Sequence, residues 1–325
     1  MKSGNPSSTS LTLPTGIQSL IMNNKMEKPL SLAIGGGKGG VGKTFVAVSL
    51  GVYIAEKGLK TLLLDMDLGG GNLHTFLGMK PAEVSLDEFF CGSEKSIDKF
   101  IKETSVPNLY YIPGIRKLYK SMSVQTGLRE KFLKQVQTLP ADIVIIDLGA
   151  GTHLFTLDIF ASADRGIVVV TPDAASVENA LRFLKCAFYR KVERLWRKYK
   201  KLIPEEEISI TSFKYPADII KFVLSSGGDE CARMAEEISE TRWDVFVNFL
   251  RNEGDLMAGE IIMRQSKVNL GVETRCVGFI NFIEGLKPLF NGGEPLPKKI
   301  HPSILFRAFH GLFQELNSFD EKLVL

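Results

Sequence analysis

The residues with the clearest chemical potential form a glycine-rich stretch near the start of the chain. Residues 37–44 read Gly-Lys-Gly-Gly-Val-Gly-Lys-Thr and satisfy the pattern G-x-x-x-x-G-K-[ST] in full. Glycines let backbone N–H groups converge on phosphate oxygens, while Lys43 reaches the β- and γ-phosphates and the Thr44 hydroxyl binds Mg²⁺. A chance match in a chain of this composition has a frequency on the order of one in a hundred. We predict nucleotide contacts from Gly37, Lys38, Gly39, Gly40, Val41, Gly42, Lys43, Thr44 and Phe45.

Carboxylates that could complete such a site follow two apolar runs. Asp65 and Asp67 come after residues 61–64, and Asp147 ends the run Ile143-Val144-Ile145-Ile146. An aspartate at the end of a buried strand commonly holds Mg²⁺ through its water shell. Helix capping is the alternative role for Asp65 and Asp67. Thr44 and Asp147 are predicted to bind the metal, Asp67 is a further carboxylate near them, and neither His74 nor His153 is expected to act as a general base.

Seven short apolar runs supply the strands that would position these residues. Helical patterns separate the runs, which favours βαβ crossovers and a mainly parallel sheet buried on both faces. We predict a doubly wound α/β fold with seven or eight mostly parallel strands and helices on both faces. The runs are Leu30–Ile34, Thr61–Leu64, Leu109–Ile112, Ile143–Ile146, Gly166–Val170, Asp244–Phe249 and Arg275–Phe282.

The chain divides into three predicted parts. Residues 1–28 are rich in Ser, Pro and Asn and are expected to form a flexible tail, in which Leu11, Ile17, Leu20 and Ile21 could dock as one short helix. Residues 29–295 form the nucleotide-binding domain, with a helical insertion at about 186–242. Residues 296–325 form a C-terminal helical segment, for which packing on the protein body is favoured over membrane targeting because its charges show no basic excess.

Composition sets limits on the class of protein. The 325 residues carry 40 Lys and Arg against 37 Asp and Glu, a net charge of +3, so nucleic-acid binding by global charge is excluded. The four cysteines form no C-x-x-C pair, which argues against a zinc or iron–sulfur site. No apolar run reaches the roughly 18 residues of a membrane span, and the N-terminus lacks the apolar core of a signal peptide. We expect a cytoplasmic protein, with peripheral membrane association as the alternative.

The glycine-rich loop resembles the deviant Walker A motif of the MinD/ParA family of ATPases. In that family a lysine at the position of Lys38 crosses a dimer interface to the partner's nucleotide, and the resemblance implies a catalytic role for Lys38, Lys43 and Asp67. Asp67 matches the switch I aspartate that lies near Mg²⁺ and the attacking water. Residues 147–152, Asp-Leu-Gly-Ala-Gly-Thr, are similar to switch II of the flagellar-number regulators (FlhG/FleN type) within the MinD branch.

The resemblance extends to the nucleotide base. Thr171, Pro172 and Asp173 match the family's T-P-E segment, and Asn248 matches the position whose amide contacts adenine. For Asn248 a simple turn role is equally compatible with the residue type. The cofactors implied are ATP and Mg²⁺, with ADP as product.

Function and partners follow from the same resemblance. It implies an ATP-dependent homodimer that positions or regulates an assembly such as the flagellum or the division site. The alternatives are a metabolic or cluster-assembly enzyme on the same fold, and an ATP-gated adaptor with little hydrolysis. A basic helical stretch, Arg190–Lys201, is either a solvated face or a contact for DNA, acidic lipid or an acidic protein.

Overall fold

The computed structural model describes most of the chain. It covers residues 28–68, 70–115, 124–199, 216–225, 227–284 and 295–320, and for residues 310 and 313–320 it describes the backbone alone. The predicted tail, except Lys28, therefore lies outside the described residues. Part of the predicted insertion, residues 200–215 and 226, also lies outside them, as do Gly69 and the last five residues.

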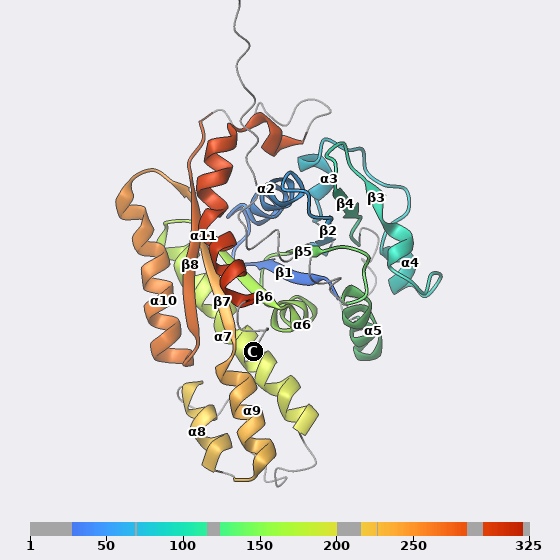
Figure 1. Cartoon of the computed structure of the whole chain (residues 1–325). Helices are drawn as coiled ribbons and strands as arrows, with labels where there is room; N and C mark the ends of the chain where they lie inside the picture. The colour runs from blue at the N-terminus through green and yellow to red at the C-terminus, as the bar shows by residue number, and fades with distance from the viewer. Residues whose placement is uncertain are drawn as a thin grey trace, which may run out of the picture.

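The centre of the molecule is an eight-stranded sheet in the order β3-β4-β2-β5-β1-β6-β7-β8 (Figure 1). All neighbouring strands are parallel except β3 and β4, which confirms the predicted mostly parallel sheet. Seven of the strands occupy the seven predicted runs; β3 has only two residues, both charged, and so leaves no apolar run in the sequence. The strands are β1 (Leu30–Gly35), β2 (Thr61–Met66), β3 (Lys102–Glu103), β4 (Leu109–Ile112), β5 (Ile143–Leu148), β6 (Arg165–Val170), β7 (Arg242–Leu250) and β8 (Glu273–Asn281).

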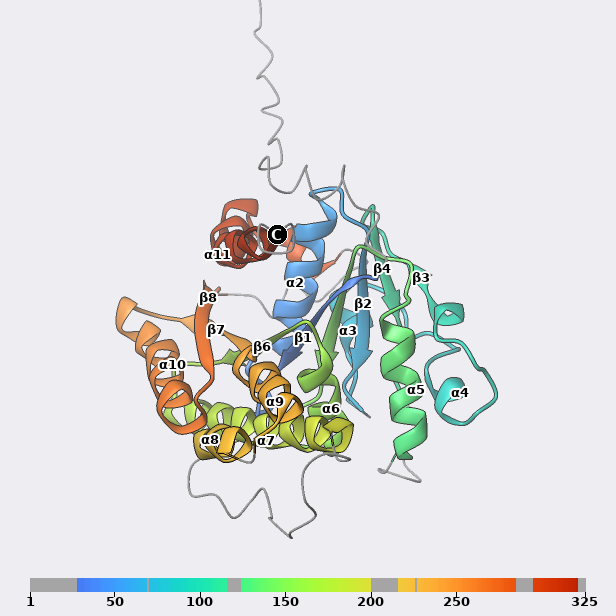
Figure 2. The same cartoon turned by 60° about the horizontal axis from the view of Figure 1, so that its bottom comes forward.

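Helices cover both faces of the sheet, as a doubly wound fold requires (Figure 2). Helices α2 (Lys43–Ala55) and α11 (Pro302–Asp320) pack on one face together with the 3-10 turn η5 (Leu296–Lys299). Helices α5 (Thr126–Val136), α6 (Leu154–Ser162), α7 (Ala174–Tyr199) and α10 (Met257–Leu270) pack on the other. The remaining short elements are α3 (Leu73–Phe76), α4 (Asp87–Phe90), η1 (Asp98–Phe100) and η3 (Glu253–Leu256).

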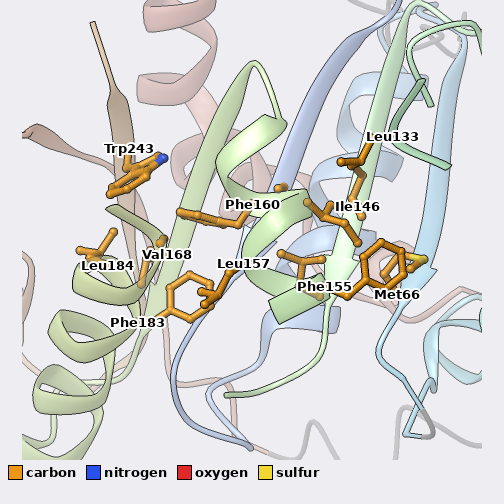
Figure 3. Packing of buried hydrophobic residues seen from close by; sticks show 14 of the residues in the cluster. Met66, Leu133, Ile146, Phe155, Leu157, Phe160, Val168, Phe183, Leu184 and Trp243 are labelled. Atoms are coloured by element: carbon orange, nitrogen blue, oxygen red, sulfur yellow. The ribbon is translucent and has the colours of Figure 1, made fainter. Parts of the chain in front are cut away.

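Each central strand contributes to two cores because its side chains alternate between the faces. In β1, Ala33 belongs to the core under α6 and α7, whereas Leu32 and Ile34 belong to the core under α2 and α11. Aromatic rings fill the first core: Phe160 lies edge-on to Phe183 at 4.8 Å between ring centroids (Figure 3). Burial on both faces explains why these strands appear in the sequence as continuous apolar runs.

The interval between β6 and β7 is helical in its described parts. Helix α7 has 26 residues, and α8 (Ala217–Ser225) and α9 (Asp229–Ser239) follow it before β7 begins. Helix α7 continues without a break across residue 186, where the insertion was expected to start. It packs against α6 and α10 and also against α9, so one helix belongs to both the nucleotide-binding domain and the interval that follows.

The C-terminal helix packs on the body of the protein. In the described part of α11, Leu305, Ala308, Phe309 and Leu312 are buried against β8 and α2. The Phe309 ring stacks on Phe246 of β7 with 5.4 Å between centroids. None of the described helices has the length and apolarity needed to cross a bilayer.

The packing of α11 leads to a prediction about stability. Replacing the fully buried Phe309 by Ala should lower the free energy of unfolding by about 3–5 kcal/mol, because it removes a ring from a filled core. The matched change Phe306→Ala, on the same helix but 40% exposed, should cost less than about 1 kcal/mol. Urea unfolding followed by far-UV circular dichroism measures both, and equal effects would show that α11 does not depend on this contact.

Candidate nucleotide site

The predicted phosphate loop joins β1 to α2 at the carboxyl edge of the sheet. Strand β1 ends at Gly35 and α2 begins at Lys43, with Gly42 as its N-cap residue. Gly40 and Gly42 have φ angles of 81° and 89°, which favour glycine. A Cβ at Gly37 would lie 2.1 Å from the backbone oxygen of Asn179 in α7. At Gly37 the loop is therefore held against α7 with no room for a side chain.

Asn248 supports the loop from the opposite side. This residue of β7 is fully buried, and its Nδ2 donates a hydrogen bond to the Val41 carbonyl at 2.9 Å. Its Oδ1 accepts a bond from the backbone N–H of Phe249 at 3.1 Å. Both ends of the amide are engaged, so in this structure Asn248 positions the phosphate loop; its predicted contact with adenine stays a prediction.

Lys43 lies at the centre of the site and is buried. Its Nζ donates to the Lys38 carbonyl at 3.3 Å, which curls the side chain back over the loop. Burial lowers the pKa of Lys43, while the negative charges of Asp147 and Asp67 act in the opposite direction. The lysine thus faces the two acidic residues predicted to belong to the metal site, which come from two different strand ends.

Asp147 is the most strongly perturbed group of this site. It lies in β5, and burial together with the negative charge of Asp65 raises its pKa well above the usual value. The Thr44 hydroxyl and Lys43 oppose that rise, yet neither carboxylate oxygen of Asp147 accepts a hydrogen bond of ordinary geometry. Buried polar atoms without partners are rare and call for a ligand or a bound water.

These residues fit a magnesium ion bound together with a nucleotide. Mg²⁺ is usually held by one or two carboxylates plus substrate phosphates, and keeps several waters. Thr44 and Asp147 lie beside each other, and Asp67 and Asp147 both act on Lys43. Among the described residues there is no group of three or more His, Cys, Asp or Glu that could hold a metal by itself. Phosphate oxygens would therefore complete the coordination.

The loop after β2 differs from the predicted arrangement in one respect. Asp65 was expected just past the strand, but it lies inside β2, is 2% exposed, and accepts a hydrogen bond from the Asp67 backbone N–H at 3.2 Å. Asp67 follows the strand. A Cβ at Gly149 would lie 2.6 Å from Asp67 Oδ1, and one at Gly71 would lie 2.5 Å from Asp65 Oδ2. The loop after β2 and the loop after β5, whose sequences resemble switch I and switch II, therefore contact each other through Asp67 and Gly149.

Lys38 is bound within its own chain. Its Nζ forms an ion pair with Asp173 Oδ1 at 3.0 Å, and both side chains are more than 40% exposed. Asp173, which follows Pro172, also accepts hydrogen bonds from the Thr171 hydroxyl and the Ser176 backbone N–H. Mainly through the Thr171 hydrogen bond, these contacts lower the pKa of Asp173. The carboxylate is thus fixed at the start of α7, next to the phosphate loop.

A cavity beyond the loop contains residues that the sequence reasoning missed. It has a volume of about 1100 Å³ and is lined by the ends of β7 and β8, including Arg251, Phe279 and Phe282. Phe45 of α2 stacks on Phe249 at 6.4 Å, Phe249 meets Phe282 at 6.3 Å, and Arg251 lies over the Phe282 ring at 5.0 Å. A series of rings therefore leads from the phosphate loop to the cavity. Aromatic residues at the carboxyl ends of two strands, Phe249 in β7 and Phe282 just after β8, were the available signal.

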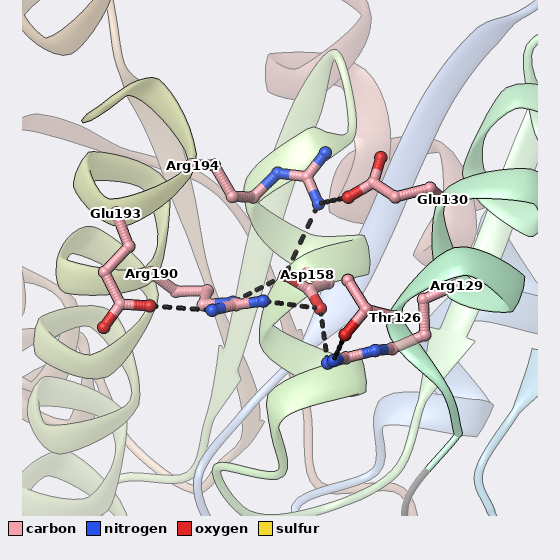
Figure 4. Close-up of polar contacts among 7 residues, drawn as sticks. All are labelled: Thr126, Arg129, Glu130, Asp158, Arg190, Glu193 and Arg194. Carbon is pink, nitrogen blue, oxygen red and sulfur yellow. Dashed lines mark hydrogen bonds and ion pairs between the residues drawn. The ribbon is translucent and has the colours of Figure 1, made fainter. Parts of the chain in front are cut away.

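Two arginines of the basic stretch of α7, Arg190 and Arg194, are paired with acidic residues of the same chain (Figure 4). Asp158 of α6, 2% exposed, accepts hydrogen bonds from Arg190 Nε at 2.6 Å, Arg129 Nη1 at 2.8 Å and Arg194 Nη1 at 3.4 Å. Glu130 and Glu193 pair with Arg194 and Arg190 in turn.

Further along α7, Lys198 pairs with Glu237 of α9, and burial lowers the pKa of Lys191. Lys200 and Lys201 lie outside the described residues. The expectation of a fully solvated basic face is therefore wrong for Arg190, which is buried and ion-paired. Arg194 and Lys198 are also engaged with acidic residues of the same chain.

Comparisons with known proteins point in one direction. A family model described as ParA, NUBPL iron-transfer P-loop NTPase matches residues 29–194. An ATP-binding protein of Methanocaldococcus jannaschii is 33% identical over 155 residues, 48% of this chain and 58% of that protein. The septum site-determining protein MinD of Synechocystis is 31% identical over 154 residues, 47% of this chain and 57% of that protein. The match thus spans little more than half the length of each of these curated relatives.

Solved structures agree in fold over nearly the whole chain. The septum site-determining protein MinD of Pyrococcus horikoshii, complexed with Mg-ADP, has a TM-score of 0.59 at 19% identity and covers 90% of this chain and 97% of its own. A variant of Cyanothece McdA in complex with ATP has a TM-score of 0.59 at 17% identity and covers 89% and 96%. At such identities the likeness establishes the fold alone.

The unpartnered Asp147 gives a prediction for the protein without nucleotide and Mg²⁺. Its folded pKa is raised above the unfolded value near 3.8, so its contribution to stability falls as pH rises above that value. Asp147→Asn should therefore raise the free energy of unfolding by about 1–2 kcal/mol at pH 7, and by much less near pH 4. Urea unfolding at the two pH values measures this. The exposed change Glu83→Gln is the control. A lower free energy of unfolding for Asp147→Asn would contradict the inference that burial of this carboxylate without a partner is destabilising.

The arginine cluster gives a second prediction. Asp158→Ala should destabilise the protein by about 3–5 kcal/mol, because it leaves three arginines without their shared buried partner. Glu178→Ala breaks the exposed pair with Arg182 and should cost no more than about 0.5 kcal/mol. Thermal and urea unfolding of both variants test this, and similar small losses would mean that Asp158 is dispensable.

Proposed function

Because this chain belongs to the MinD/ParA family of P-loop NTPases, we propose that it is a Mg²⁺-dependent ATPase whose nucleotide state controls the association of two copies. The observation that carries this proposal is the buried Asp147 without a hydrogen-bond partner, beside Thr44 and Lys43 at a complete phosphate loop. A site for an uncharged ligand would not need a buried carboxylate and a buried lysine beside a phosphate-binding loop.

In the proposed ATP complex, the loop N–H groups and Lys43 contact the phosphates, and the ring-lined cavity of Arg251 and Phe282 receives the base side of the nucleotide. Thr44, Asp67 and Asp147 would hold Mg²⁺, which neutralises charge on the phosphates when bound. The Asn248 bond to Val41 keeps the loop in position for binding. Pro172 and Asp173 border the same site.

For hydrolysis, Asp67 would orient the attacking water. Phosphoryl transfer depends mainly on positioning and charge stabilisation, so a strong general base is not required. The close approach of Asp67 to Gly149 supports a joint response of both loops to the γ-phosphate, because a shift of one loop changes the packing of the other. Loss of the γ-phosphate would then release both loops together.

Lys38 is the residue proposed to act across the dimer. Its present partner is the exposed Asp173, and an exposed ion pair contributes only about 0–1 kcal/mol. Lys38 could therefore exchange Asp173 for the phosphates of a second subunit at little cost. There it would stabilise charge on the transferring phosphate, as an arginine finger does.

The process served by this switch belongs to the proposal as well. One relative is named a septum site-determining protein, and another structure is a MinC:MinD cell division protein complex. We therefore propose a role in positioning or regulating a cellular assembly, such as the division site or the flagellum, from the cytoplasm and through a protein partner. DNA or membrane contact through Arg190–Lys201 is less favoured, since Arg190, Arg194 and Lys198 already have acidic partners.

Three single variants test the proposed function. Lys43→Ala should weaken binding of a fluorescent ATP analogue by about 100-fold, since it removes a charged contact to the phosphates. Asp67→Ala should bind ATP and form dimers, yet hydrolyse about 100-fold more slowly. Lys38→Ala should bind ATP but remain monomeric. The control is Lys99→Ala, an exposed lysine far along the chain from these motifs.

Sizing chromatography in ADP and in ATP, together with phosphate release, gives the readouts. The proposal fails if the unaltered protein stays monomeric in ATP and Mg²⁺, or if Asp67→Ala hydrolyses ATP at the normal rate. Adding vesicles or DNA to the turnover assay shows whether an anionic surface stimulates hydrolysis, which would favour that partner over a protein.

A further inference from the structure

A groove between α2 and α11 lies away from the nucleotide site. It has a volume of about 640 Å³ and is lined by the last turn of α2 and by the segment from η5 to the start of α11. Its apolar lining includes Tyr53, Ile300, Leu305 and Phe306, and the Phe306 ring is 40% exposed. An aromatic ring with this much exposure at the edge of a filled core is a surface suited to an apolar partner.

The start of the described chain lies close to this groove. The backbone N–H of Leu30 donates to the Asp142 carbonyl at 3.0 Å, and the N–H of Asp142 donates to the Lys60 carbonyl at 2.8 Å. Lys57, which lines the groove, is three residues before Lys60. The path from Leu30 to Lys60 crosses two spacings between neighbouring strands, and the path from Lys60 to Lys57 adds three residues. The distance from Leu30 to Lys57 is therefore at most about 20 Å. Leu30 also packs on the core beneath α2 and α11, so the chain arrives on the correct face.

The chain that precedes Lys28 contains a segment of matching character. Ile17, Leu20 and Ile21 repeat at the spacing of one helical face, and residues 3–24 contain no charged side chain. Seven residues connect Ile21 to Lys28 and span up to about 24 Å when extended. The segment can therefore reach the groove. The groove is lined by Lys57, Lys298 and Glu56, and Glu56 lies 3.8 Å from Lys298. The rim therefore carries little net charge, which suits an uncharged segment.

We propose that residues 17–21 of the same chain occupy the α2–α11 groove, with Ile17, Leu20 and Ile21 against Tyr53 and Phe306. The segment then covers the Phe306 ring and lies against the last turn of α2. Helix α2 begins at the phosphate loop, so the contact connects the N-terminal segment to the helix that carries the loop. This inference does not depend on ATP hydrolysis, so it can fail while the proposed function stands.

Disulfide cross-linking of the full chain tests the proposal. Gln18→Cys places a thiol between the apolar anchors, and Lys57→Cys places one on the groove, in a background with the exposed Cys91 and Cys276 changed to Ser. Mild oxidation of dilute protein should join positions 18 and 57 within one chain. The control pair, Gln18→Cys with Lys131→Cys on α5 at the opposite face of the sheet, should give a yield about tenfold lower.

Disruptive changes then identify the contact. Leu20→Asp or Phe306→Glu should each reduce the 18–57 yield by about tenfold, whereas Ser8→Asp should leave it unchanged. Unfolding midpoints confirm that each variant is folded. The proposal is overturned if the 18–57 yield does not exceed that of the control pair, or if the product is a covalent dimer, which would identify a second copy as the occupant.

Discussion

The charge balance around Lys43 governs the arrangement of the rest of the site. One buried lysine faces Asp67 from the end of β2 and Asp147 from β5, and Asp65 adds a third negative charge beside Asp147. Burying carboxylates close together is costly, because desolvation and mutual repulsion both disfavour their charged forms. A divalent cation bound with a polyphosphate would relieve that repulsion, so the acids fit the proposed Mg²⁺ and nucleotide.

That arrangement can exist only because close backbone packing holds the groups in place. The strand order β2-β5-β1 brings the two acidic strand ends next to the phosphate loop, and the loop is clamped between Asn179 of α7 and Asn248 of β7. Gly149 packs directly against Asp67, and Gly71 packs directly against Asp65. A Cβ at either glycine would collide with the carboxylate.

Prediction from sequence succeeded where the signal was local. The phosphate loop and Asp147 each combine a residue pattern with an adjoining apolar run, and the seven runs became seven strands because burial on both faces leaves no polar alternation. Asp65 was predicted to follow the second strand but lies within it, because pairing with β5 extends β2 to Met66. The Asn248 bond to Val41 joins residues 207 positions apart, and no local pattern encodes such a contact.

The same limit explains why the basic stretch of α7 was misread. Sequence shows seven cations at helical spacing but not the acids that face them from other elements, such as Asp158 on α6 and Glu237 on α9. Since α6 begins just after residues 149–152 and α7 begins at the Asp173 partner of Lys38, the Asp158 cluster fastens together the two helices that leave the nucleotide site. These arginines therefore contribute to the internal rigidity of the protein.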